Sequence, residues 1–131
     1  FKDISSIIFQ SANSLGDDFS FEKGIFSKVF GAAQEAMGYI GNHAKQKKMG
    51  NVLQSCKDFL DLCSHVIVAW RLMESAKLAN EKLVNASGDE AEFYKSKIVD
   101  FKVYCSQYLV HATALAKSIT SVQEDYSTYS I

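Results

Sequence analysis

The last third of the chain carries the most regular pattern of apolar positions. Nine apolar or aromatic residues, counting a cysteine as a small hydrophobe, are spaced alternately four and three apart: Tyr94, Ile98, Phe101, Cys105, Tyr108, Ala112, Leu115, Ile119 and Val122. This spacing is typical of a helix that packs against other helices as in a coiled coil. Because the chain contains no proline, nothing limits such a helix to three or four turns. The pattern predicts one long helix over about 88–122.

The segment before it, about 49–86, carries two apolar stripes. The first is a heptad seam, flanked by Leu53, Leu60 and Ile67, and consists of Met49, Val52, Cys56, Phe59, Cys63, Val66, Trp70 and Met73. The second lies on a different face and consists of Leu62, Ala69, Leu72, Ala76, Ala79 and Leu83. We therefore expect this helix to be the central one, covered on more than one side. A capping-box pattern at 87–90 predicts the turn into the last helix.

Two further helices are predicted before residue 49. A weak seam indicates a helix over 1–15 that stops at Gly16. A second helix is expected over about 21–48, with Ser20 as its N-cap. The residues at 50–51, glycine and asparagine, are expected to break or bend the chain before the next helix.

These elements predict an all-α fold in a single domain over residues 1–131. We expect an antiparallel up-down bundle of about four helices with a left-handed supercoil, in which the two long helices, about 49–86 and 88–122, are antiparallel neighbours. From 123 to 131 the seam fades into serine, threonine and tyrosine, which predicts a frayed tail. Since the first residue is Phe1 and not methionine, we expect the chain to be part of a longer protein.

Composition and charge exclude several classes of partner. The chain has 131 residues, of which 47% are hydrophobic and 22% charged, as in an ordinary globular domain. Fourteen basic against fifteen acidic residues give no field that would hold nucleic acid and no basic run that would hold a membrane surface. No apolar run approaches the ~18 residues of a membrane span. Three cysteines at predicted buried positions favour a reducing, cytoplasmic compartment.

The sequence predicts no catalytic, cofactor-binding or metal-binding residue. No glutamate stands three residues before any of the three histidines, as a di-iron bundle requires. Cys56 and Cys63 would lie about 10 Å apart on a helix, too far to share a zinc ion. There is no glycine-rich phosphate loop. We expect His65 and His111 to be packing residues, and the Cys105 thiol to be buried, protonated and inert.

Two sets of residues are candidates for a docking surface. Three valines lie off the main seam of the last helix, and three glycines fall seven apart on one face of the 21–48 helix. They are Val99, Val103 and Val110, and Gly24, Gly31 and Gly38. For the glycines we favour close packing of helices, which absent side chains permit. The alternative is a groove that admits an acyl chain or the edge of a cofactor.

Several runs in the second half of the chain resemble a known family. The runs 59–62, 68–70, 92–98, 103–104 and 112–116 are similar to the extra C-terminal helical domain of certain acyl-CoA dehydrogenases. The resemblance covers about 21–120, is clearest from residue 49 onward and consists of helix-packing motifs. This chain differs from the family in two places.

The first difference is a proline that the family commonly carries after the leucine of its last helix, where this chain has Leu109 and Val110. The second is a Phe-Tyr pair, where this chain has Val103 and Tyr104. We expect a straighter final helix here for lack of that proline.

The resemblance implies a parent enzyme that removes hydrogens from the α and β carbons of an acyl-CoA thioester, with FAD as the hydride acceptor and a glutamate as the base. The base and the flavin-binding residues belong to domains that precede this one in the family. No residue here inherits either role, and FAD is expected in the parent chain only. This segment would brace, cap or oligomerise the catalytic domains of the same chain, and we expect a homo-oligomer.

Two other functions stay open. The chain would be a free-standing interaction module if its native gene starts near Phe1, binding a partner helix through an exposed apolar groove. It would be a small carrier if its bundle core holds an acyl chain, which native mass spectrometry would detect.

Overall fold

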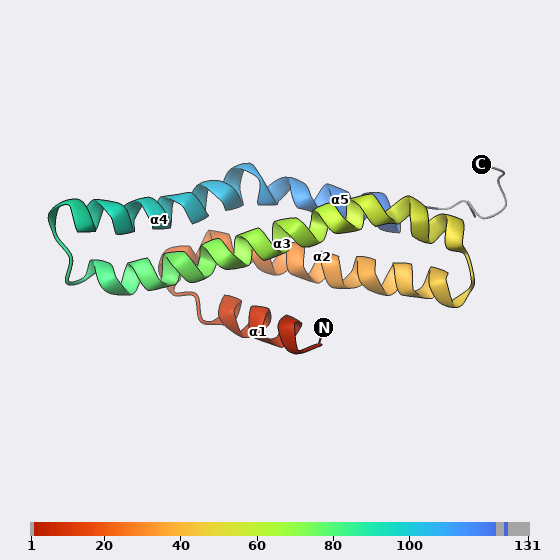
Figure 1. The fold of residues 1–131 in the computed structure, drawn as a ribbon, viewed down its shortest axis with the longest axis horizontal. Coiled ribbons are helices and arrows are strands. Elements are labelled where there is room, and N and C mark those ends of the chain that lie inside the picture. The colour runs from red at the N-terminus through yellow and green to blue at the C-terminus, as the bar shows by residue number, and fades with distance from the viewer. Residues whose placement is uncertain (1, 123–124, 126–131) are drawn as a thin grey trace.

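The chain forms an antiparallel bundle of helices in a computed structural model, which describes residues 2–122 and 125 (Figure 1). Its α-helices are α1 (Lys2–Asn13), α2 (Ser20–Lys45), α3 (Met49–Leu83), α4 (Gly88–Gln107) and α5 (Ala112–Thr120), with short 3-10 helices η1 (Asp17–Phe19) and η2 (Leu109–His111). The described part of the chain contains no strand. The predicted all-α bundle is confirmed, and its left-handed supercoil stays a prediction.

Helix α3 is the central rod, with 35 residues and a length of about 52 Å. It packs against α1, α2, α4 and α5. Its fully buried positions belong mostly to the second predicted stripe and include Leu62, Ala69, Met73, Ala76 and Ala79. This burial shows that the stripe faces the core, where its alanines let neighbouring helices approach closely. The heptad seam is only partly buried, and its first residue, Met49, is exposed.

The prediction of one straight helix over 88–122 is wrong. The helix is interrupted at 108–111, where Tyr108 has φ −121° and ψ −50° and the chain tightens into η2. The buried positions after Cys105 are Leu109, Ala112, Ala116 and Ile119, whereas Tyr108 is 56% exposed. The break thus moves two seam positions on by one residue, from Tyr108 to Leu109 and from Leu115 to Ala116, while Ala112 and Ile119 are buried as predicted. Proline is not required for such a break, because a 3-10 turn produces it.

The connections differ from the predictions in detail. The chain turns at 46–48, where Lys47 has a positive φ of 59°, and not at 50–51, which lie inside α3. Ser20 is the first residue of α2 and forms no side-chain cap. Ser87 does precede α4 as predicted, but its side chain makes no capping hydrogen bond. The predicted tail at 123–131 lies outside the described residues, apart from residue 125.

Helix α1 is short and covers only part of one side of the bundle. Ile8 and Ala12 are buried, and α1 packs against both α2 and α3. Its carboxyl end is held by Lys77 of α3, whose Nζ donates to the carbonyl oxygen of Ser11 at 3.2 Å and to Oγ of Ser14 at 2.7 Å. Figure 1 shows that α1 does not reach the end of the bundle where α2 connects to α3. On that side α2 and α3 are therefore left partly uncovered.

Candidate docking surface

The predicted docking residues lie on two separate helical surfaces. Val99 and Val103 of α4 are exposed, and Val110 in η2 is half-buried. The glycines belong to α2 and are exposed, and a methyl group at Gly24, Gly31 or Gly38 would meet no atom within 4 Å. The interpretation that these glycines pack closely against a neighbouring helix is therefore wrong. They remain available to a partner.

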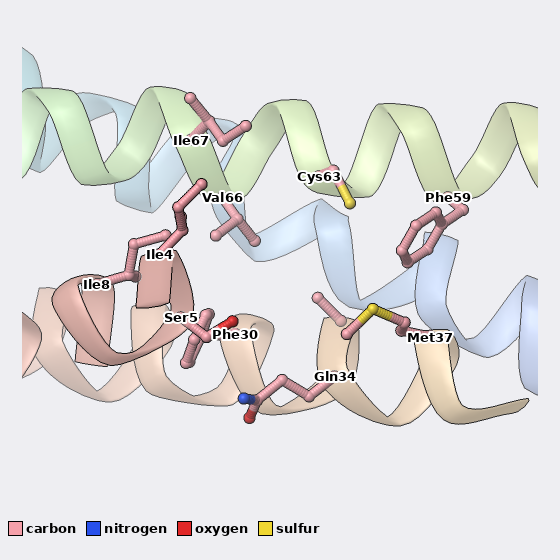
Figure 2. Close-up of a pocket in the computed structure, with 11 residues that line it drawn as sticks. Ile4, Ser5, Ile8, Phe30, Gln34, Met37, Phe59, Cys63, Val66 and Ile67 are labelled. Atoms are coloured by element: carbon pink, nitrogen blue, oxygen red, sulfur yellow. The ribbon is translucent and has the colours of Figure 1, made fainter. Parts of the chain in front are cut away.

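An apolar groove lies where α1, α2 and α3 meet (Figure 2). Figure 2 shows Ile4 and Ile8 of α1 beside Ile67 of α3, and Phe59 and Cys63 of α3 above Met37 of α2. The volume of the groove is about 140 Å³, well below the roughly 300–1,000 Å³ of ordinary ligand pockets. The groove is therefore smaller than an ordinary small-molecule site.

Next to the groove, α3 presents apolar side chains to solvent at heptad spacing. We call these residues the outward seam: Met49, Leu53, Cys56, Leu60, Cys63 and Ile67. Leu53 and Leu60 expose 65% and 67% of their surface, and Met49 and Ile67 expose 53% and 51%. The sequence pattern contained all six residues but did not indicate that they face outward. A contiguous apolar surface of this kind on a monomer usually marks an interaction site.

A polar cleft of about 400 Å³ lies on another side of α3, beside the bend between α4 and α5. Nδ1 of His65 and the hydroxyl of Tyr104 form a hydrogen bond of 2.8 Å, and burial raises the pKa of Tyr104. The ring of Tyr108 stacks on that of Tyr104 with centroids 5.6 Å apart. His65 is thus a satisfied packing residue as predicted, whereas His111 is exposed.

Side chains of the polar cleft are engaged in local hydrogen bonds. Its only serine, Ser64, donates its hydroxyl to the carbonyl oxygen of Leu60 at 2.9 Å, within the same helix. Across the described residues there is no group of three His, Cys, Asp or Glu side chains that could hold a metal ion.

The three cysteines are free thiols that lie in three different environments. Cys105 is buried in the core, and this burial, with a smaller contribution from the Glu22 carboxylate, raises its pKa to about 12. Burial also raises the pKa of the half-buried Cys63. Cys56 is exposed, so the prediction that all three thiols are buried is wrong. Cys56 is exposed because it lies on the outward seam of α3.

Comparison with known families then identifies this bundle. The family model described as "Acetyl-CoA dehydrogenase C-terminal like" matches residues 2–128. The chain belongs to the acetyl-CoA dehydrogenase C-terminal-like family. Comparisons with curated proteins and with solved structures gave no match.

Membership of the acetyl-CoA dehydrogenase C-terminal-like family confirms the resemblance seen in the helical motifs. The match also extends beyond the range of about 21–120 that those motifs cover, because it includes α1 and residues 121–128. Among the described helices of this family member, none combines the length and apolarity needed to cross a membrane.

Proposed function

We propose that this chain is the non-catalytic C-terminal helical domain of a longer, FAD-dependent acyl-CoA dehydrogenase, which it braces or oligomerises. The parent enzyme would introduce a double bond between the α and β carbons of an acyl-CoA thioester. The observation that carries the proposal is the family match over residues 2–128. The domain would act by packing, through the outward seam and the groove beside it.

Neither the groove nor the polar cleft fits a flavin dinucleotide. The groove is smaller than an ordinary ligand pocket. The polar cleft is large enough, but no glycine, lysine or arginine lines it, whereas dinucleotide diphosphates are usually held by a glycine-rich turn at a helix N-terminus. No catalytic step is therefore assigned to this chain, and the flavin and the base would belong to the parent's other domains.

The small groove also argues against the acyl-carrier function. A fatty acyl chain would need a cavity deep in the bundle, but the core there is filled by side chains with no exposed surface, such as Phe26, Leu62, Met73 and Phe101. The interaction-module function uses the same exposed seam as the proposed bracing role. The residues encoded upstream of Phe1 distinguish these two functions.

The test is to read the coding sequence upstream of Phe1 and to purify the full gene product beside the 131-residue chain. We expect the full protein to be yellow, with FAD absorbance, and to reduce an electron acceptor when an acyl-CoA is added. The 131-residue chain should be colourless and inactive. An upstream region without a flavoenzyme, or stoichiometric FAD in the 131-residue chain, would contradict the proposal.

A further inference from the structure

The outward seam has the geometry of half a coiled coil. Its six residues are spaced four, three, four, three and four apart, from Met49 to Ile67, and none of them is charged. Two helices interlock when each presents apolar residues at this spacing. The inward face of α3 already packs in the core, so the outward seam is a second apolar face of the same helix, and most of it is exposed.

A trough runs beside this ridge. The groove separates the outward seam from α2, and Gln34 of α2 lies at its edge (Figure 2). Gly31 and Gly38 stand three residues before and four residues after Gln34, so they share its side of the helix. Since nothing lies within 4 Å of a methyl group placed at either glycine, no neighbouring element covers this side of α2, and the glycines add no side chains to it. The outward seam of α3 therefore forms a ridge, and the groove with the glycine side of α2 forms a trough beside it.

We propose that this face, the outward seam with the adjoining groove, binds the same face of a second copy of the chain. A two-fold axis running along α3 would lay the ridge of each copy in the trough of the other, as an isologous interface requires. The inference rests on the oligomerising role in the proposed function, and names its partner and its surface.

The size of the face suits a weak dimer. The outward seam is about 28 Å long at 1.5 Å per residue, and two packed helices present a width of about 20 Å. The flat footprint is thus about 560 Å² per copy, or about 1,100 Å² for the pair, which is below the roughly 800 Å² per partner of a standard stable interface and in the range of weak ones.

The charges beside the outward seam do not select a charged partner. The exposed Lys57 is paired within its own helix with Asp61, with Nζ to Oδ2 at 3.1 Å. The seam itself offers no net charge for an acidic or a basic partner to recognise. What it offers is apolar heptad spacing, which an identical seam matches.

The test is a matched pair of substitutions on α3, Leu60→Glu in the outward seam and Leu78→Glu outside it. Both leucines are exposed, at 67% and 52%, so neither change disturbs the core, which circular dichroism checks. In sedimentation equilibrium of the 131-residue chain we expect a dimer of twice 14.6 kDa. Leu60→Glu should weaken dimerisation by at least about tenfold, and Leu78→Glu by less than about twofold.

A wild-type chain that stays monomeric up to about 100 μM, where a weak specific dimer would form, would overturn the inference. An equal effect of the two substitutions would also overturn it. The proposed function fails separately: a dimer broken by Leu60→Glu, with no flavoenzyme encoded upstream, would leave the interface in place and remove the dehydrogenase. A flavoenzyme encoded upstream, together with a chain that stays monomeric, would support the dehydrogenase and remove the interface.

Discussion

The two apolar faces of α3 differ in a way that the sequence pattern does not suggest. The inward face mixes Leu62, Val66 and Met73 with alanines, and its residues are nearly or wholly buried. The outward seam has the more regular heptad spacing and larger side chains, yet Leu53 and Leu60 are about two thirds exposed. Small residues allow several helices to converge on one face, whereas a regular seam of large residues suits a single partner. Regular spacing thus indicates that a helix will pair, but not with which partner.

The largest expected effect is on the free energy of unfolding. It compares two leucines of α3, one on the inward face and one on the outward seam. Leu62→Ala removes a side chain with no exposed surface and should lower the free energy of unfolding by about 2–5 kcal/mol. Leu60→Ala, in dilute protein, should change it by less than about 0.5 kcal/mol. Urea denaturation of both variants measures the contrast. Similar losses for the two variants would mean that the outward seam is part of the folded core.

A second prediction concerns how the free energy of unfolding changes with pH in alkaline solution. Burial raises the pKa of Cys105 in the folded protein to about 12, from an ordinary value of 9.0. Below the ordinary pKa the thiol is protonated in both states and stability is unaffected. Above it the unfolded chain loses the proton first, so stability should fall between about pH 9 and 12, by at most about 1.4 kcal/mol per pH unit.

Unfolding measured at pH 8 and pH 10 checks the contribution of this thiol. Cys105→Ala serves as the control, because it keeps every other titrating group and should give a smaller loss. A wild-type protein that loses no more stability than the variant over this range would show that the thiol does not titrate as expected.

A smaller effect is expected at the end of α1. Lys77→Met keeps the apolar stem of the side chain but removes the hydrogen bonds to Ser11 and Ser14. We expect a loss of about 1 kcal/mol, confined to α1 and visible as faster hydrogen exchange in 2–13 with little change in α4. Exchange that accelerates equally throughout the bundle would show instead that Lys77 supports the whole core.

The smallest expected effect is a gain in the free energy of unfolding. Gly31→Ala places a methyl group at an exposed helical position with nothing within 4 Å, so it should stabilise the dilute monomer by about 0.5–1 kcal/mol through helix propensity. Thermal unfolding of the variant checks this. A loss of stability would restore the interpretation that Gly31 packs against a neighbouring helix.

Most of the fold could be predicted from the sequence, because heptad spacing and turn residues are local signals. The all-α bundle, the central position of α3 and the turn at Ser87 were all predicted. The break at Tyr108 was not, since the choice between Tyr108 and Leu109 for the core depends on how α4 and α5 pack on α2 and α3. Spacing alone favoured the tyrosine, and tertiary packing favoured the leucine.

The docking surface was predicted less well, for a similar reason. The residues of the outward seam were all part of an apolar pattern, but its exposure follows from the short α1, which leaves one side of α2 and α3 partly uncovered. The valines and glycines were chosen because they lie off the main seam or share a face. Only the structure shows that the side of α2 carrying Gly31 and Gly38 adjoins the groove at Gln34.

The native cysteines give the most direct measurement of the central claim, that α3 folds through one face and docks through the other. Maleimide labelling of the unmodified chain, mapped by peptide mass spectrometry, would follow Cys56 on the outward seam, Cys63 at the groove and Cys105 in the core. We predict that Cys56 reacts fastest and Cys105 slowest, and that raising the protein concentration slows Cys56 and Cys63 alone. Fast labelling of Cys105, or rates for Cys56 and Cys63 that do not depend on protein concentration, would contradict it.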